Sequence, residues 1–283
     1  MINVLVTGGN GQLAACLKDL VFDLEGYTFT FLGKSELDIS NSDQVDQNFS
    51  DFKWDFCINC AAYTAVDKAE SEIDLATRIN KIGVKNLAES CKKYKTKLIH
   101  ISTDFVFNGD NNQPYKEVDS VAPLGVYGLT KLEGEQEVTK VLEQYFVIRT
   151  SWLYSEHGNN FMKTMLRLGA ERSSLGVVSD QHGTPTYAKD LARFVLTLVK
   201  NDSSAYGVYH YSNLGETTWY GFAKEIFKLS NLGIDLKGIV TSEYPTPAER
   251  PKYSVLDKTK TMTTFHVQIP TWQAGLKEAL SNL

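Results

Sequence analysis

The first half of the chain alternates between short apolar runs and longer segments in which apolar residues recur every three or four positions. Uninterrupted apolar runs predict buried parallel strands, and the longer spacing predicts helices that cover them. The predicted strands are 2–6, 28–32, 56–60, 98–102 and 145–149, and the predicted helices are 13–21, 41–52, 71–94 and 126–142. This alternation is typical of an α/β fold, a doubly wound parallel sheet of the Rossmann type.

The alternation of predicted strands and helices becomes less regular after residue 152. Helices are predicted at 160–170, 187–199, 218–229 and 272–280, with one strand at 208–211. We therefore expect a Rossmann domain over 1–151 and a smaller α/β domain formed mainly by 152–283, and we leave open whether segments of the second return to the first. Ligands of such sheets lie beyond the carboxyl ends of the strands, so the chemistry should follow the five predicted strands.

Composition and charge narrow the choice of partners. The 283 residues are 42% hydrophobic and 22% charged, which is ordinary for a globular enzyme. A net charge of −5 without a run of Lys and Arg argues against a nucleic-acid partner. The N-terminus has no signal-peptide pattern, and no stretch of about 18 apolar residues occurs. We expect a cytoplasmic protein that does not enter the membrane.

The four cysteines include a C-x-x-C pair, Cys57 and Cys60, of the kind that binds zinc or cycles between redox states. Both lie in a predicted strand, where side chains three positions apart point to opposite faces. We therefore expect neither a shared metal nor a disulfide. Four cysteines are also too few for a disulfide scaffold and suit a reducing compartment.

The segment after the first strand has the form of a phosphate-binding turn. It reads Gly-Gly-Asn-Gly-Gln-Leu-Ala from position 8 and leads directly into a helix. Gly8 suits the tight turn, Gly11 lets the backbone approach a pyrophosphate, and the small Ala14 lets the helix pack on the sheet. A purely structural glycine turn is the alternative. The position of this segment between a strand and a helix favours dinucleotide binding over that alternative.

The second strand lacks the acid that usually holds the ribose hydroxyls. It is followed by Gly33, Lys34 and Ser35, and the nearest acid is Glu36. A lysine and a serine suit a 2′-phosphate, so NADPH is favoured, with NADH as the alternative.

Tyr127 and Lys131 form a Tyr-x-x-x-Lys pattern on a predicted helix. Residues four apart share a helix face, so the phenol and the ammonium converge, and the cation is expected to lower the pKa of the tyrosine. Such a tyrosine can donate a proton to a carbonyl that receives a hydride. A hydroxyl at the end of the fourth strand, from Ser102 or Thr103, should lie beside it. An ordinary surface Tyr–Lys pair is the alternative.

These motifs together resemble the extended short-chain dehydrogenases/reductases, over essentially the whole chain. Within that family the chain is similar to members that reduce dTDP-4-dehydro-β-L-rhamnose to dTDP-β-L-rhamnose, the last step of dTDP-L-rhamnose biosynthesis. The segments that carry the resemblance are 8–13, 59–70, 102–107, 127–131, 149–152, 160–161, 180–186 and 250–251.

The resemblance implies a role for each matched position. The catalytic residues would be Tyr127, Lys131 and Thr103, of which the first two also touch the cofactor. Cofactor contacts would come from Gly8, Asn10, Gly11, Gln12, Leu13, Lys34, Asp38, Ile39, Ala61, Ala62 and Tyr63. The second domain would bind the sugar nucleotide, and substrate contacts would come from Thr103, Asp104, Trp152, Asn160 and Arg250, the last meeting the diphosphate.

The chain departs from the family at Cys16, where members that dimerise through magnesium carry a glutamate. We therefore expect no metal site and either a monomer or a homodimer. Two other functions stay open: another nucleotide-sugar reductase or epimerase, and a regulatory subunit that binds the cofactor without catalysis. An epimerase would consume no cofactor, and a regulatory subunit would not need Thr103, Tyr127 and Lys131 together.

Overall fold

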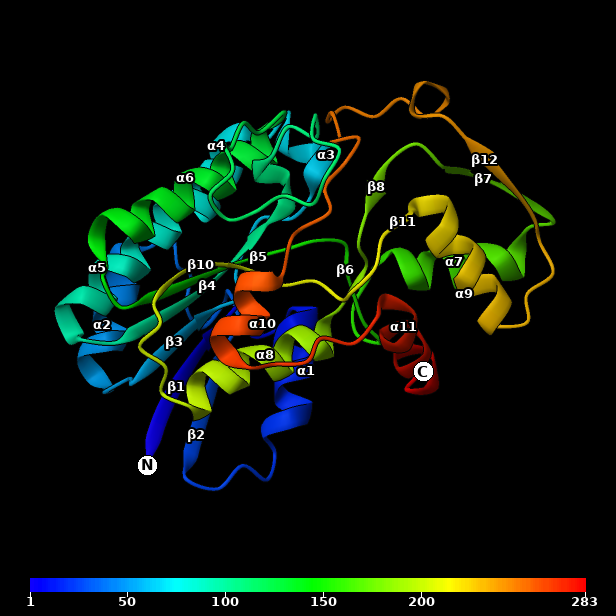
Figure 1. The fold of residues 1–283 in the computed structure, drawn as a ribbon. Helices are drawn as coiled ribbons and strands as arrows, with labels where there is room; N and C mark the ends of the chain where they lie inside the picture. The colour runs from blue at the N-terminus through cyan, green and yellow to red at the C-terminus, as the bar shows by residue number, and fades with distance from the viewer.

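A parallel sheet of six strands forms the centre of the larger lobe in the computed structural model, which describes residues 1–283 (Figure 1). The strand order is β10-β5-β4-β3-β1-β2. The order reverses between β1 and β3, which makes their carboxyl edge the expected ligand crevice. The predicted doubly wound sheet is confirmed. Its strands are β1 (Ile2–Thr7), β2 (Tyr27–Leu32), β3 (Phe56–Asn59), β4 (Lys97–Thr103), β5 (Tyr145–Thr150) and β10 (Gly207–His210).

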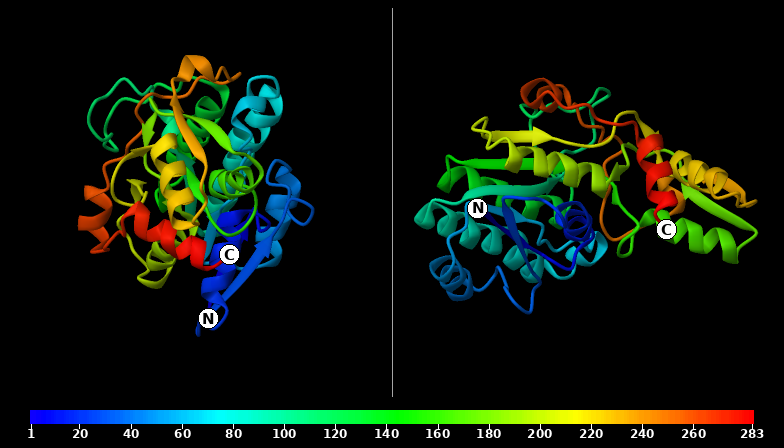
Figure 2. Two further views of the ribbon diagram at one scale, coloured as in Figure 1. Left: turned by 90° about the vertical axis from the view of Figure 1, so that its right-hand side faces the viewer. Right: turned by 90° about the horizontal axis from the view of Figure 1, so that it is seen from below.

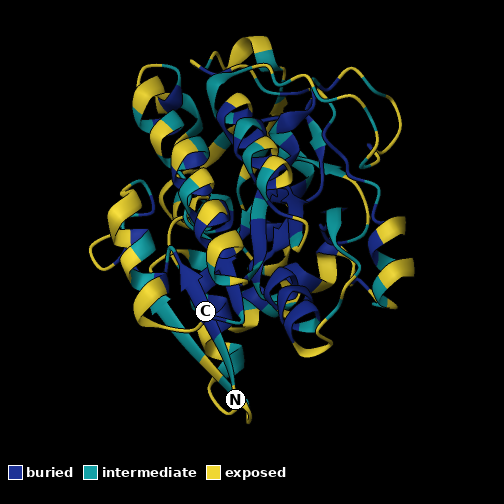
Figure 3. Cartoon of the chain, turned by 90° about the vertical axis from the view of Figure 1, so that its left-hand side faces the viewer, coloured by how far each residue is buried: buried dark blue, intermediate teal, exposed yellow.

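Helices cover both faces of this sheet, and their outer surfaces are exposed while the strands are largely buried (Figure 3). One face carries α1 (Gln12–Val21), α8 (Ala188–Lys200) and α10 (Thr259–Phe265), and the other carries α2 (Ser42–Asp51), α5 (Val84–Tyr94) and α6 (Val126–Val141).

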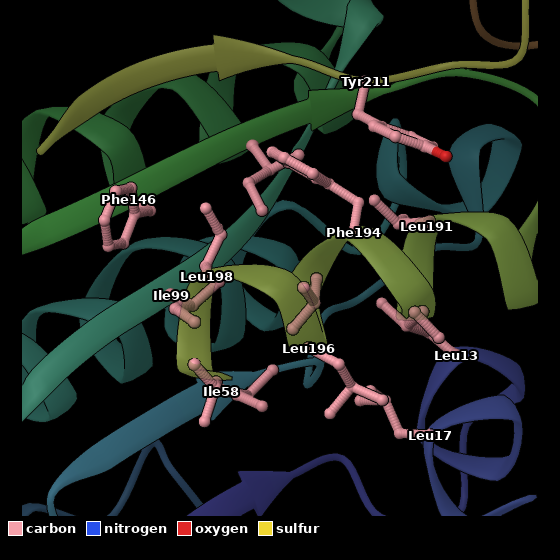
Figure 4. Packing of buried hydrophobic residues seen from close by; sticks show 14 of the residues in the cluster. Leu13, Leu17, Ile58, Ile99, Phe146, Leu191, Phe194, Leu196, Leu198 and Tyr211 are labelled. Carbon is pink, nitrogen blue, oxygen red and sulfur yellow. The ribbon is translucent and has the colours of Figure 1, made fainter. Parts of the chain in front are cut away.

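Leucines of α1 and α8 pack on the first face (Figure 4). Leu17 and Leu198 belong to the same buried cluster as Ile58 of β3, and each is fully buried. Burying one such side chain contributes about 1.5–3 kcal/mol, so this packing fixes α1 and the turn that precedes it against the sheet.

The smaller lobe lies beside the carboxyl ends of the strands (Figure 2). Its centre is a parallel pair, β7 (Ser174–Val178) and β12 (Asp235–Ile239), packed by α7 (Phe161–Glu171) and α9 (Trp219–Leu229). A separate core around Tyr154 and Phe222 holds α11 (Trp272–Ser281) against α9. Two short strand pairs connect the lobes: β6 (Leu153–Tyr154) with β9 (Thr186–Tyr187), and β8 (His182–Gly183) with β11 (Thr217–Thr218).

All of the predicted strands form, but the predicted long helix over 71–94 is wrong in one respect. It is divided into α4 (Ile73–Thr77), a π-helical turn η1 (Arg78–Gly83) and α5. The turn forms where the buried Asn80 bonds outside the helix. The elements not predicted from the sequence are β6, β7, β8, β9, β11, β12 and α10, the short helix α3 (Val66–Ala69), and the 3₁₀ turns η2 (Asp104–Val106) and η3 (Thr241–Glu243).

The predicted domain boundary at residue 151 stays a proposal. With that boundary, β10 and α8 would be the segments of the second domain that return to the first, because β10 pairs with β5 in the sheet and α8 packs on α1. No helix of the chain combines the length and the apolarity needed to cross a membrane.

The expected geometry of the C-x-x-C pair is confirmed. Cys57 lies in the core on the α5 face of the sheet, whereas Cys60 packs against the core on the α1 face. Both thiols are free.

Candidate active site

The turn after β1 leaves room for a pyrophosphate. Gly8 has a positive φ of 64°, and a Cβ on it would lie 2.6 Å from the amide nitrogen of Ala61. Gly11 stands at the N-terminus of α1, where no side chain caps the helix. The first N–H groups of α1 are therefore free to bind an anion. Ala14 is fully buried against the sheet, as the packing argument requires.

A pocket of about 270 Å³ continues from this turn along the carboxyl ends of β1, β2 and β3. Lys34 lines it, while the carboxylate of Glu36 accepts a hydrogen bond of 2.8 Å from the backbone of Gly33. Glu36 is thus used within its own turn, which leaves Lys34 as the charged group suited to a 2′-phosphate. The other predicted cofactor residues that line this pocket are Gly8, Asn10, Gly11, Asp38, Ile39, Ala61 and Ala62.

A second pocket, of about 660 Å³, brings the three predicted catalytic residues together. Thr103 ends β4, and Tyr127 and Lys131 lie on successive turns of α6. The glycine turn borders the same pocket through Asn10, Gly11, Gln12 and Leu13. A cofactor held at the turn therefore reaches the catalytic residues in one continuous space.

The prediction that Lys131 lowers the pKa of Tyr127 is wrong for this structure. Burial raises the pKa of Tyr127 to about 12, the nearby Thr103 hydroxyl opposes this, and Asp104 adds to it. Lys131 instead donates a hydrogen bond of 2.6 Å from Nζ to the carbonyl of Ile101. Burial lowers the pKa of Lys131 to about 8. Tyr127 is therefore held as a neutral phenol, the form that donates a proton.

Two glycines let α6 approach its neighbours closely. A Cβ on Gly128 would lie 2.2 Å from the carbonyl oxygen of Phe105, in the turn that follows Thr103. A Cβ on Gly134 would lie 2.2 Å from the carbonyl oxygen of Asn80. A side chain at either position would push α6 away from these carbonyl groups, so the two glycines keep Tyr127 beside Thr103.

Asn80 and Glu70 also hold the catalytic helix, and neither was predicted as a site residue from the sequence. The amide of Asn80 bonds both backbone groups of Tyr63, at 2.8 and 3.1 Å, and the hydroxyl of Thr130 at 3.1 Å. Glu70 accepts a hydrogen bond of 2.9 Å from the backbone of Val126, at the start of α6. The acid placed three residues after Asp67 was the one signal in the sequence, because the π-helical turn at Asn80 is visible only in the structure.

A buried ion pair lies beneath the pocket. Glu135, one turn after Lys131, accepts hydrogen bonds of 2.7–3.2 Å from Arg149 of β5 and another from the hydroxyl of Ser102. Both charged side chains are almost fully buried. The pair fixes α6 to the ends of β4 and β5.

Two stacked tryptophans line the same pocket as the catalytic residues. Trp152 has a positive φ of 47°, and its ring lies 3.6 Å from the ring of Trp219 at an angle of 10°. A Cβ on Gly183 would lie 2.5 Å from the Trp152 ring, so this glycine provides the space for it. Trp219 borders the pocket as well and was not predicted.

A third pocket, of about 700 Å³, lies beside the second in the smaller lobe. Apolar side chains of α7 and β7 line it, with Arg167, Arg172 and Gln181 around its edge. Trp219 and Arg250 border both pockets. A ligand with a reactive sugar in the second pocket and a nucleotide in the third would pass Arg250.

Three other predicted site residues have contacts or surroundings that the sequence did not indicate. Asn160 lines the second pocket, but its amide caps α7 and donates 2.7 Å to the carbonyl of Ser155. Tyr63 lines neither the pocket at the glycine turn nor the catalytic pocket, because its phenol donates to Glu72 at 2.8 Å. Asp104 is buried beside Thr103, and burial raises its pKa to about 6.

One group of possible metal ligands comes together at Asp19, Glu156 and His157. His157 pairs with Asp19 at 2.7 Å, and Glu156 accepts a hydrogen bond from the hydroxyl of Tyr187 at 3.1 Å. The neighbouring Cys16 is buried, and burial raises the pKa of its thiol to about 12. A buried, protonated thiol is a poor ligand.

Comparison with known proteins places the chain in a family. The family model described as RmlD substrate binding domain matches residues 2–283. The dTDP-4-dehydrorhamnose reductase of Aggregatibacter actinomycetemcomitans is 41% identical over 98% of both chains, and that of Escherichia coli K12 is 38% identical over 100% of this chain and 98% of its own.

A solved structure agrees with these relatives. The dTDP-4-dehydrorhamnose reductase of Bacillus anthracis in complex with NADP is 42% identical, covers 100% of both chains and superposes with a TM-score of 0.97. As the resemblance to the extended short-chain dehydrogenases/reductases predicts, the chain belongs to the RmlD substrate binding domain family, that of the dTDP-4-dehydrorhamnose reductases.

Proposed function

We propose that this chain catalyses the NADPH-dependent reduction of dTDP-4-dehydro-β-L-rhamnose to dTDP-β-L-rhamnose. One observation carries the proposal: Thr103, Tyr127 and Lys131 line a single pocket with the glycine turn, and this pocket shares Trp219 and Arg250 with the third pocket, which two more arginines line. A carbonyl reductase needs the first arrangement, and a nucleotide diphosphate needs the second.

The residues of the chain have distinct tasks in this reaction. The cofactor supplies a hydride to C4 of the keto sugar. The neutral phenol of Tyr127 donates a proton to the C4 oxygen, and the Thr103 hydroxyl stabilises the charge that develops there. The ammonium of Lys131, which lines the same pocket, would hold the nicotinamide ribose.

The stacked tryptophans would orient the sugar. Trp152 and Trp219 give the catalytic pocket an apolar surface, and Arg250, which borders both pockets, would meet the diphosphate. We assign Asn160 to holding the loop before α7, because its amide is used in bonds to that loop. The remaining sites stay as predicted from the resemblance.

Loss of NADPH absorbance on addition of dTDP-4-dehydro-β-L-rhamnose tests the function. Tyr127→Phe keeps the ring but removes the proton donor, so kcat should fall by about 10²–10⁴-fold, the usual contribution of a general acid. Tyr145→Phe, on β5, is the matched control and should leave kcat unchanged. Unchanged turnover in Tyr127→Phe would refute the mechanism.

The same assay separates the alternatives. An epimerase would interconvert sugars without net loss of NADPH, and a regulatory subunit would bind the cofactor without any turnover. Faster turnover with NADH than with NADPH would refute the role given to Lys34.

We further propose that the chain is a monomer or a homodimer and binds no nucleic acid, in keeping with its net charge of −5. We also propose a cytoplasmic location, which suits four unpaired cysteines.

A further inference from the structure

An ion pair between Asp67 and Arg250 joins the two lobes at the junction of the catalytic and nucleotide pockets. Asp67 lies in α3, just after β3, and Arg250 follows 183 residues later. Nη1 donates to Oδ1 at 3.0 Å and Nη2 donates to Oδ2 at 2.9 Å. The carboxylate therefore takes the guanidinium end-on, in the paired geometry that suits both groups.

Further hydrogen bonds fix the same guanidinium. Nη1 also donates to the hydroxyl of Thr246 at 2.6 Å and to the carbonyl of Ala248 at 3.1 Å. The backbone N–H of Ala248 donates to Asp67 at 3.3 Å. Asp67 thus binds both the arginine and the loop that carries it.

The adjacent edge of the guanidinium remains available. Its Nε–H and second Nη2–H make no hydrogen bond within the protein, and the Arg250 side chain is 23% exposed where it borders both pockets. Two parallel N–H groups on one edge match two oxygens of a phosphate. The arrangement leaves the phosphate-binding edge free while Asp67 occupies the other.

The pair has little value for stability alone. The side chain of Asp67 is 40% exposed, and ion pairs as exposed as this one contribute little to folding. A mobile arginine, in contrast, loses much rotamer freedom when a ligand immobilises it. Holding the arginine in place before the ligand arrives removes that cost from binding.

We propose that Asp67 is a positioning residue for the substrate: it holds Arg250 so that the free edge of the guanidinium receives the diphosphate of the sugar nucleotide. This inference rests on the proposed function. Asp67 acts through Arg250 and touches no reacting atom.

Steady-state kinetics of Asp67→Asn test the inference. The KM for the sugar nucleotide should rise about tenfold, which corresponds to about 1.4 kcal/mol, while kcat, the KM for NADPH and the melting temperature stay close to wild type. Asp67→Glu keeps the charge and should recover part of the loss. Asp46→Asn, which removes the surface pair with Lys93, is the matched control and should change nothing.

A double-mutant cycle shows whether Asp67 works through the arginine. In an Arg250→Ala background, Asp67→Asn should raise the KM no further. An equal rise in both backgrounds would overturn the inference. So would an unchanged KM in Asp67→Asn, or a lower one, which would mean that Asp67 competes with the substrate for Arg250.

Binding of dTDP separates this inference from the proposed function. The nucleotide carries the diphosphate but no keto sugar, so its affinity, measured by calorimetry, does not depend on turnover. Asp67→Asn should weaken dTDP binding about tenfold, by the same 1.4 kcal/mol. Absence of wild-type turnover would refute the function, whereas equal dTDP affinity in wild type and Asp67→Asn would refute the role of Asp67.

Discussion

Gly128→Ala should impair catalysis far more than folding. The added Cβ would lie 2.2 Å from the carbonyl oxygen of Phe105, where ordinary contacts begin at 3.4 Å. The start of α6 and the turn after Thr103 must therefore separate by about 1 Å, and a misplacement of this size can cost about 10²-fold in rate. Because Tyr127 and Thr103 lie on the two sides of this contact, we expect the loss in kcat.

The expected change in stability is small because two effects oppose each other. Alanine gains about 1 kcal/mol over glycine within a helix, and overpacking costs about 1–3 kcal/mol. The free energy of unfolding, measured with urea, should fall by no more than about 2 kcal/mol, the difference between these ranges.

NADPH oxidation measured under saturating substrate checks the prediction. Gly233→Ala is the matched control, because no atom lies within 4 Å of the Cβ it would add, and it should keep wild-type kcat. A kcat for Gly128→Ala within a few-fold of wild type would refute the claim that this glycine sets the distance between the proton donor and Thr103.

Two further predictions concern buried charges. Burial raises the pKa of Asp104 from its usual 3.8 to about 6, so the folded chain keeps a proton that the unfolded chain releases, and the free energy of unfolding should fall as pH rises from about 4 to about 6. Asp104→Asn should remove that fall in urea titrations at the two pH values, and an identical pH dependence in both proteins would contradict it. Glu135→Gln leaves Arg149 buried without its partner and should cost about 3–5 kcal/mol of stability. Replacing Arg149 with Met in the same chain should recover most of this loss, and failure to recover would contradict the pairing.

Most of the central sheet was predictable because β1, β3, β4 and β5 are largely buried and read as nearly uninterrupted apolar runs. The strands of the smaller lobe give no such signal. β7 and β12 each contain a glycine and alternate in exposure over only part of their length, and several other strands are only two residues long. A pattern with a period of two cannot be recognised over two residues.

The catalytic residues were predictable because their spacing along one helix carries the chemistry. Their surroundings were not, because they depend on contacts between distant segments. Nothing near Asp67 indicates that its partner is Arg250, and nothing in the sequence shows that Gly183 makes room for Trp152. The state of Tyr127 was mispredicted for the same reason, since its pKa follows burial rather than the spacing to Lys131.

The short helix α3 links the two halves of the proposed reaction. Asp67 holds the arginine at the junction of the pockets, and Glu70, three residues later, binds the backbone at the start of α6. One turn of helix therefore connects the group that would bind the substrate's diphosphate to the helix that carries Tyr127. Because Asn80 ties the preceding loop to Thr130 of the same helix, α3 cannot move without disturbing α6. The position of the substrate's anion and that of the proton donor are thus set by the same segment.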